Sequence, residues 1–228
     1  MKNIEDIRNI FVQKYEDEDF IVDKSGCGML EVLGTSFIAD EETIFGKVNK
    51  VYIQKELDWY LSQSRNVYDI PGTPAIWKQV ATKDGMINSN YGFLLFSKEN
   101  AEQYLHAFQA LVADKNTRRA CMIYTRPSIQ TEYCHDGMSD FICTNAVSYF
   151  IRNNKIHCTV QMRSNDIWAG YRNDYAWQRW VLNNLHKDLL REYEDLELGD
   201  IIWNASSLHM YERNFGLIRK YKKLGLYK

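Results

Sequence analysis

The stretch that decides the fold is CTNAVSYFIR (143–152), followed by NN (153–154) and KIHCTVQMR (155–163). Its two long segments have the composition of β-strands, with many β-branched and aromatic residues. The dipeptide Asn153-Asn154 between them suits a tight turn, because asparagine tolerates positive φ angles. The pattern therefore predicts a β-hairpin.

The segments on either side of this hairpin extend the same architecture. RRACMIYTR (118–126) precedes it and predicts another strand, and GDIIWNASSLHMY (199–211) predicts a final one. Between the hairpin and that final strand, DYAWQRWVLNNLHKDLLREY (174–193) has the apolar spacing of a long amphipathic helix. Long helices mixed with neighbouring antiparallel strands indicate an α+β fold.

The N-terminal half alternates helices with short strands. Apolar spacing predicts helices over 4–17, 51–64 and 99–115, with strand-like pieces over 20–23 and 29–39 and a loop over 85–92. No low-complexity linker or internal repeat interrupts the 228 residues. We therefore expect one domain spanning residues 1–228.

Composition excludes several classes of function. Net charge is −2, so no global field would hold a long nucleic acid. Five cysteines without CxxC spacing argue against a disulfide scaffold and for a reducing compartment. No apolar stretch approaches the roughly 20 residues of a membrane span. We expect a cytoplasmic protein with no membrane partner.

Cys143 and the arginines are the first candidates for chemistry. A lone cysteine is more often a small buried apolar residue than a nucleophile, and a nucleophile needs cationic neighbours that lower its pKa. Arg118-Arg119 at the start of a strand, and Arg163-Ser164 at the end of another, could bind phosphate or could be solvated strand ends. The residues alone leave both alternatives open.

Metal binding has little support in the sequence. Cys134-His135 and His157-Cys158 do not match the spacing of known metal-ligand patterns. We expect no metal cofactor.

Taken together, the motifs resemble the thymidylate synthase superfamily. In order they are KSGCG, ELDWYL, NYG, TRR, a lone cysteine, RSNDIWAGYRND and LHMY, from about residue 20 to residue 211. The likeness is greatest to the deoxycytidylate hydroxymethylases of T-even-type phages, on the stretches INSNYG, MIYTRPS, DGMSDF, MRSND and RNDYAWQ. The resemblance implies a thymidylate synthase-like fold: a large mixed or antiparallel sheet packed with helices, in a homodimer formed through the sheet face.

The resemblance also gives the nucleotide ligands. It implies that Cys143 adds to C6 of a pyrimidine and that Arg163 and Ser164 bind the phosphate of the same subunit. Arg118 and Arg119 would reach the phosphate of the neighbouring subunit. Further matched residues are Lys24 on the phosphate loop, Tyr91 beside the cysteine, and His209 and Tyr211 at the sugar 3′-hydroxyl.

The remaining matched positions concern proton transfer and folate. Glu56 matches the carboxylate that orders water and relays protons. On the folate side the resemblance assigns Trp77, Asp166 and Gly170. The implied co-substrate is 5,10-methylenetetrahydrofolate.

Asp174 decides which base is bound. It lies 11 residues beyond Arg163, where thymidylate synthases have asparagine. Cytosine offers an amino donor at N4 and a bare acceptor at N3, and a carboxylate complements both once N3 is protonated. An aspartate that merely caps the helix starting at 174 is the alternative.

Three departures from the family pattern stand out. Thr144 follows the cysteine where thymidylate synthases have histidine, and Ser148 replaces a usual glutamine, which puts one hydrogen bond of the base-binding network in doubt. Because the sequence ends at Lys228, we expect the tail that closes over folate to be abbreviated or arranged differently.

The sequence therefore predicts folate-dependent hydroxymethylation of dCMP at C5. A thymidylate synthase or a dUMP or CMP hydroxymethylase of the same fold is the alternative, as is a non-catalytic scaffold or RNA-binding regulator. Expected partners are dCMP, folate and a second copy of the chain, with other nucleotide-synthesis enzymes as further candidates.

Overall fold

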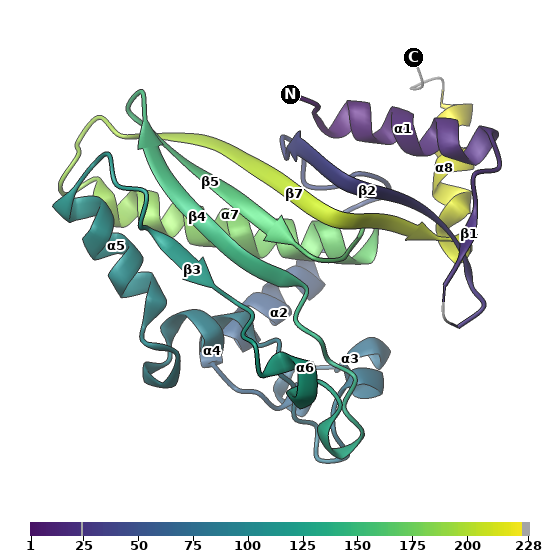
Figure 1. Cartoon of the computed structure of the whole chain (residues 1–228), viewed down its shortest axis with the longest axis horizontal. Helices are drawn as coiled ribbons and strands as arrows, with labels where there is room; N and C mark the ends of the chain where they lie inside the picture. Colours follow the sequence, from purple (N-terminus) through teal and green to yellow (C-terminus); the bar gives the residue numbers. More distant parts are fainter. Residues whose placement is uncertain (24, 225–228) are drawn as a thin grey trace.

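A mixed β-sheet forms the centre of this computed structural model, which describes residues 1–23 and 25–224. Within those residues the sheet has seven strands in the order β1-β2-β7-β5-β4-β3, with β6 pairing beside β7 (Figure 1). The strands are β1 (Ile21–Val22), β2 (Gly28–Ile38), β3 (Cys121–Ile123), β4 (Thr144–Arg152), β5 (Lys155–Met162), β6 (Asn165–Asp166) and β7 (Glu197–Tyr211). The predicted α+β class with a large mixed sheet is confirmed.

The strand register explains how distant residues meet. β4 and β5 form the predicted hairpin, with Asn153 and Asn154 in the turn at φ angles of 50° and 60°. β1 pairs with β2, β2 with β7 and β3 with β4 antiparallel, whereas β5 and β6 run parallel to β7. Parallel neighbours need a crossover connection, and helix α7 (Ala169–Leu189) provides it.

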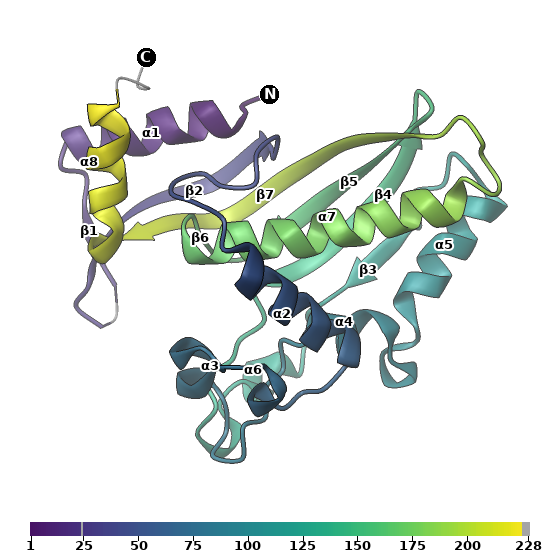
Figure 2. The same ribbon diagram turned by 180° about the vertical axis from the view of Figure 1, so that it is seen from behind.

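Helices cover one face of the sheet and one end of it. Figure 2 shows α7 lying across the sheet with α2 and α4 beside it, while α1 and α8 lie together near β1 and β2. The other helices are α1 (Ile4–Glu16), α2 (Lys50–Ser62), α3 (Ala75–Val80), α4 (Tyr91–Phe96), α5 (Gln103–Ala113), α6 (Ile129–Glu132) and α8 (Phe215–Lys223). Single 3₁₀ turns are η1 (Val67–Asp69), η2 (Lys98–Asn100), η3 (His135–Gly137) and η4 (Glu212–Asn214).

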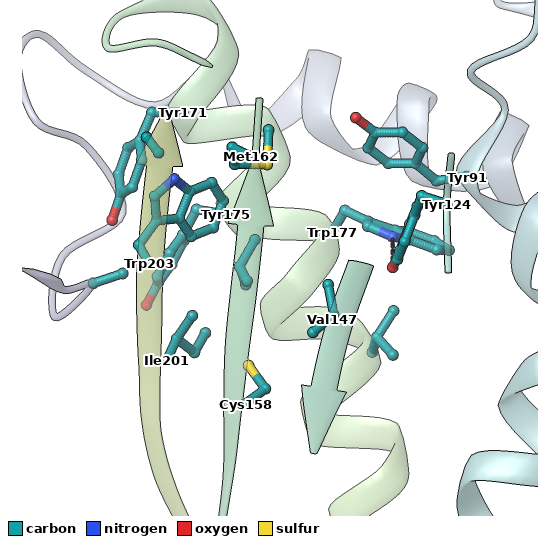
Figure 3. Close-up of a cluster of buried hydrophobic side chains, with 14 of the residues drawn as sticks. Tyr91, Tyr124, Val147, Cys158, Met162, Tyr171, Tyr175, Trp177, Ile201 and Trp203 are labelled. Atoms are coloured by element: carbon teal, nitrogen blue, oxygen red, sulfur yellow. Dashed lines mark hydrogen bonds between the residues drawn. The ribbon is translucent and has the colours of Figure 1, made fainter. Parts of the chain in front are cut away.

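The main core lies between α7 and the sheet, and it is rich in aromatic rings. Figure 3 shows Trp177 of α7 beside Tyr124, and Trp203 of β7 beside Tyr171. Both tryptophans are fully buried, and Trp177 Nε1 donates to the Tyr124 hydroxyl at 3.0 Å. Truncating a buried tryptophan typically costs about 3–5 kcal/mol. This packing fixes α7 on the sheet, and with it Asp174, one helical turn before Trp177.

Three local predictions were wrong. The long helix begins at Ala169 and ends at Leu189, instead of spanning 174–193. The reason at its start is Asp166, whose carboxylate accepts from the amides of residues 168 and 169 and so caps the helix five residues early. Asp174 therefore lies inside the helix, and the interpretation that it caps the helix is excluded.

The other two errors concern a strand and a loop. Of the strand predicted over 118–126, only Cys121–Ile123 pairs with β4. The Arg118-Arg119 pair lies just before this paired segment. The loop predicted over 85–92 ends within helix α4, which starts at Tyr91. The Asn90 side chain accepts from the Phe93 amide at 2.7 Å and caps that helix.

Candidate active site

The β4–β5 hairpin brings Cys143 and Arg163 together. Cys143 immediately precedes β4 and Arg163 immediately follows β5, so the antiparallel register sets them opposite one another. The Arg163 amide donates to the Cys143 carbonyl oxygen at 2.9 Å, which continues the ladder one step beyond the strands. The two side chains also meet, with Arg163 Nη2 at 3.8 Å from Cys143 Sγ.

The protein backbone holds the Arg163 side chain in place. Its Nε donates to the Ile142 carbonyl at 2.9 Å, its Nη2 donates to the Phe141 carbonyl at 2.5 Å, and its guanidinium carbon lies 4.5 Å from the Phe141 ring centroid. Burial raises the pKa of the Cys143 thiol to about 11, and the positive charge of Arg163 opposes that rise. Arg163 is thus the fixed cation that favours a thiolate here.

Glu56 of α2 is buried and accepts hydrogen bonds from α2 and α3. Tyr52 lies one turn earlier on α2 and donates its hydroxyl to Glu56 Oε1 at 2.5 Å, and Trp77 Nε1 of α3 donates to the same oxygen at 3.3 Å. Burial raises the pKa of Glu56 to about 7, although both hydrogen bonds favour the charged form. A carboxyl group that titrates near neutrality can both accept and return a proton.

Asp174 is the second carboxyl group of the site, and it is half-buried. Its Oδ2 accepts from Asn165 Nδ2 at 2.8 Å, and its Oδ1 accepts from the Tyr91 hydroxyl at 3.4 Å. Burial raises the pKa of Asp174 to about 8, and the negative charge of Glu56 adds to the rise. Near neutral pH Asp174 therefore holds a proton in much of the population.

A chain of hydroxyl groups links the cysteine strand to Asp174. Thr144, which directly follows Cys143, donates from Oγ1 to the Tyr91 hydroxyl at 3.0 Å, and Tyr91 in turn donates to Asp174. Thr144 and Tyr91 are buried, and Asp174 is half-buried. The orientation of Asp174 is therefore coupled to the strand that bears the thiol.

The end of β7 supplies another group of residues. Asp166 pairs with His209 in the β6–β7 register, and the His209 ring stands edge-on to Tyr211 with centroids 5.2 Å apart. Burial lowers the pKa of His209, against the nearby negative charges of Asp166 and Glu31, so its imidazole is neutral at neutral pH.

Gly170 lies next to the hydrogen bond between Asn165 and Asp174 and has no side chain to crowd it. A Cβ atom at this position would lie 3.2 Å from Asn165 Nδ2 and 3.6 Å from Asp174 Oδ2. A side chain here would press on the amide that donates to Asp174, which would have to shift by a few tenths of an ångström.

The structure separates the other predicted phosphate ligands from this group. Arg118 and Arg119 are exposed, and in the part of the chain that the structure describes neither guanidinium group has a hydrogen bond or an ion pair. The backbone beside them lies level with Cys158, five positions before Arg163. At about 3.3 Å per residue this is roughly 16 Å along the sheet from Arg163. Ser164 is half-buried next to Arg163, whereas Lys24 lies outside the described residues.

The sequence analysis missed two polar neighbours of the carboxyl groups. Tyr52 stands four residues before Glu56, a spacing that puts both on one helix face and could have predicted the contact. Asn165 lies within the RSND motif, but only the packing of β6 against α7 brings it to Asp174. Among residues 1–23 and 25–224 there is no cluster of three or more potential metal ligands, and no helix has the length and apolar character to cross a membrane.

Comparisons with known proteins show the family and the fold of this chain. Residues 23–223 match a family described as thymidylate synthase. The chain is 50% identical to the deoxycytidylate 5-hydroxymethyltransferase of Enterobacteria phage T4, over 97% of this chain and 92% of that protein. It is 51% identical to the phage T2 protein of the same name, over 94% and 89%. A solved thermostable thymidylate synthase A from Bacillus subtilis superposes with a TM-score of 0.70 at 20% identity, covering 97% of this chain and 84% of that one.

Proposed function

This chain belongs to the thymidylate synthase family and has its fold, and we propose that it hydroxymethylates dCMP at C5. The reaction consumes dCMP, 5,10-methylenetetrahydrofolate and water, and gives 5-hydroxymethyl-dCMP and tetrahydrofolate. The observation that supports it most is the half-buried carboxyl group of Asp174, hydrogen-bonded to Asn165 and Tyr91. The 50% identity with a phage protein named deoxycytidylate 5-hydroxymethyltransferase supports the same assignment.

Asp174 suits cytosine in the protonation state that its burial favours. A protonated carboxyl group donates its O–H to the bare N3 of cytosine and accepts from the N4 amino group through its other oxygen. Transfer of that proton to N3 gives a carboxylate paired with a cationic ring, which draws electrons away from C6. Uracil already carries a hydrogen at N3, so it cannot take up this proton, and an ionised Asp174 would leave the uracil O4 without a donor.

In this proposal Cys143 is the nucleophile. Its sulfur bonds to C6 of the protonated ring, and the electron pair of the C5–C6 double bond becomes available at C5. When bound, 5,10-methylenetetrahydrofolate supplies the electrophilic one-carbon unit, with tetrahydrofolate as the leaving group. C5 then loses its proton, water adds to the new exocyclic carbon, and the S–C6 bond breaks to return the thiolate.

Glu56 is the proposed proton carrier for the added water. With a pKa of about 7, it can take a proton from water and return one within a single turnover. Tyr52 and Trp77 both donate to its Oε1, which leaves Oε2 available to a water molecule.

Three residues support folate binding on the side of the proposed site where Glu56 lies. Trp77 is half-buried, and its Nε1 is already bonded to Tyr52 and Glu56, so the indole has a fixed orientation against which a flat pterin can stack. Gly170 keeps the start of α7 free of a side chain. Asp166 uses Oδ1 for two backbone amides and retains Oδ2 as an acceptor for pterin N–H groups.

We further propose that the active enzyme is a homodimer formed through the sheet face opposite α7. Arg163, Ser164 and the Lys24 loop would bind the phosphate within one subunit, while Arg118 and Arg119 would come from the partner. Two features support this: the distance between these arginines and Arg163 along the sheet, and the 56% exposure of Ile123 beside the fully buried Met122 on β3.

The sugar lies between these two ends of the nucleotide. His209 and Tyr211 are the proposed ligands of its 3′-hydroxyl group. The whole chain then acts as one catalytic domain.

The test is incubation of the purified protein with 5,10-methylenetetrahydrofolate and either dCMP or dUMP, followed by identification of nucleotide and folate products. We expect 5-hydroxymethyl-dCMP together with tetrahydrofolate. Release of dihydrofolate with a methylated product would instead identify a thymidylate synthase-type reaction. Turnover of dUMP in preference to dCMP would contradict the role of Asp174, and no turnover of either would favour a non-catalytic protein.

A further inference from the structure

Two residues outside the proposed ligand set stand next to His209 on β2 and β7. In the antiparallel register, Glu31 of β2 is directly opposite His209, and Leu33 is opposite Ser207. Residues two apart on a strand share a face, and directly opposed residues are cross-strand neighbours. Glu31, Ser207 and His209 therefore form one group on the same face of the sheet.

Hydrogen bonds connect these three side chains, and the position of the Ser207 hydrogen determines which group donates in each. The Ser207 hydroxyl donates to Glu31 Oε1 through a short hydrogen bond, and Ser207 Oγ lies 3.3 Å from His209 Nδ1. A hydroxyl group has a single hydrogen, and here a carboxylate takes it. Ser207 Oγ can then act toward the imidazole only as an acceptor, which requires a hydrogen on Nδ1.

The other charged groups around His209 leave its second nitrogen available. Asp166 faces it from β6, where its Oδ1 accepts from two amides at the start of α7, and among the described residues no hydrogen bond joins its carboxylate to the imidazole. Arg163 acts on His209 electrostatically and has its own backbone partners. Among the described residues none forms a hydrogen bond with Nε2. Because the buried imidazole is neutral, a hydrogen on Nδ1 makes Nε2 a pure acceptor.

We propose that Glu31 and Ser207 are positioning residues that hold His209 with its hydrogen on Nδ1, so that Nε2 accepts a hydrogen bond from the free 3′-hydroxyl group of the nucleotide. The inference rests on the proposed function in taking His209 as a ligand of the sugar. It adds a specificity: a nucleotide whose 3′-oxygen is alkylated or esterified has no hydrogen to donate. The site therefore selects free nucleotides against nucleotides linked through their 3′-oxygen.

The first experiment pairs protein variants with altered ligands. Dissociation constants are measured for dCMP, 2′,3′-dideoxy-CMP and 3′-O-methyl-dCMP. Wild type should bind dCMP about five- to tenfold more tightly than either analogue, the usual effect of one hydrogen bond. Ser207→Ala and Glu31→Ala should reduce that preference to about twofold by weakening dCMP alone. Glu31→Gln should retain it, because an amide oxygen also accepts from Ser207.

Two further measurements separate positioning from a general structural effect. Glu197→Ala removes an exposed carboxylate twelve positions before His209 on the same strand, and it should leave all three dissociation constants unchanged. Nitrogen-15 chemical shifts of His209 in the free protein report the tautomer directly. Wild type and Glu31→Gln should carry the hydrogen on Nδ1, whereas Ser207→Ala and Glu31→Ala should show a mixture of tautomers.

Two results would overturn the proposal. One is a hydrogen on Nε2 in the wild type, and the other is equal weakening of dCMP and the two analogues by Ser207→Ala. Failure of the proposed function would look different, because wild-type protein would then bind none of the three nucleotides while its tautomer could still be measured. Thermal unfolding of each variant identifies any that fail to fold, and Glu31→Gln provides the conservative replacement.

Discussion

The two ends of the proposed nucleotide site differ in how completely one chain builds them. At the base end, Glu56 is buried and Asp174 is half-buried, and each accepts two hydrogen bonds from the same chain. At the phosphate end, Arg118 and Arg119 are exposed and have no side-chain partner among the described residues. The proposed base end is thus built by one chain, whereas two of the cations proposed for the phosphate end have no side-chain partner in the part of the chain that the structure describes.

This difference indicates that the base end serves the chemistry and that the phosphate end depends on subunit assembly. Removing two carboxyl groups from water opposes folding. Burial raises the pKa of both Glu56 and Asp174, and the negative charge of Glu56 raises the pKa of Asp174 further. Such a cost is expected where the groups act on a ligand. Exposed arginines cost little in the monomer and become useful only when a partner subunit brings a phosphate to them. Lesions at the two ends should therefore have different consequences.

The largest effect is expected from Cys143→Ser at the base end. The serine hydroxyl is a far weaker nucleophile toward C6, so turnover should fall by about 10⁴-fold or more, while the dissociation constant for dCMP changes by less than about tenfold. Cys121→Ser, which changes a thiol of β3 outside this site, is the matched control and should keep full activity. Turnover of a few per cent or more in Cys143→Ser would remove the thiol as nucleophile.

The next largest effect concerns the choice of base. Asp174→Asn keeps the size of the side chain but replaces the titratable carboxyl group by an amide that matches uracil. Loss of a charge-assisted hydrogen bond should cost about 2–4 kcal/mol, or roughly 30- to 1000-fold in kcat/KM for dCMP. Efficiency with dUMP should rise from near background, so that the preference inverts.

Steady-state kinetics of both proteins on both nucleotides measure this inversion. Asp188→Asn is the control, because Asp188 lies on the same helix but accepts from the Tyr104 hydroxyl away from the site. Equal weakening of dCMP and dUMP by Asp174→Asn would mean that Asp174 does not select the base.

The contrast between the two ends also explains what the sequence could predict. The hairpin was predictable because Asn153-Asn154 and the strand composition are local signals, and it fixes Cys143 opposite Arg163. The role expected of Asp174 came from its position within a family motif. The hydrogen-bond partners of Asp174 could not be predicted from that motif, because Asn165 and Tyr91 meet Asp174 only through the packing of α7, β6 and α4. Likewise, no local pattern indicates that Asp166 starts α7 at Ala169.

At the phosphate end, the third prediction tests whether sites are shared between subunits. Arg119→Ala and Cys143→Ser should each be inactive or nearly so when alone. After subunit exchange in equal amounts, half of the dimers are mixed, and each mixed dimer contains one site with neither lesion. Activity should therefore recover to about one quarter of wild type.

The matched control mixes Cys143→Ser with Arg163→Ala. Cys143 and Arg163 belong to the same chain's site, so every site in a mixed dimer retains a lesion and no activity should return. Recovery in both mixtures, or in neither after confirmed exchange, would contradict the proposed division between the two ends.

A fourth prediction uses stability of the free protein. The folded-state pKa of Asp174 is about 8 against a reference of 3.8, so between these values the folded state retains a proton that the unfolded chain has lost. Stability from this group is present at pH 4 and is lost as pH rises toward 8. Asp174→Asn should therefore be more stable than wild type by roughly 1–3 kcal/mol at pH 8, with little difference at pH 4.

Urea unfolding at several pH values measures the difference. Arg119→Ala, at the exposed phosphate end, should leave the pH dependence of stability unchanged. A stability difference for Asp174→Asn that stays constant from pH 4 to pH 8 would show that Asp174 has the same protonation in both states.

The smallest effect is expected from Thr144→Val, which cuts the hydroxyl chain between the cysteine strand and Asp174 without altering volume. Tyr91 loses the donor at 3.0 Å but keeps its own hydrogen for Asp174. Loss of one neutral hydrogen bond should cost about 0.5–1.5 kcal/mol, or roughly two- to twelvefold in kcat/KM for dCMP. Because Asp174 is unchanged, dUMP should stay a poor substrate, in contrast to Asp174→Asn. Thr144→Ser retains the hydroxyl and should recover most of the loss. If Thr144→Val instead opened the site to dUMP, base choice would depend on the whole chain of hydroxyl groups and not on the carboxyl group alone.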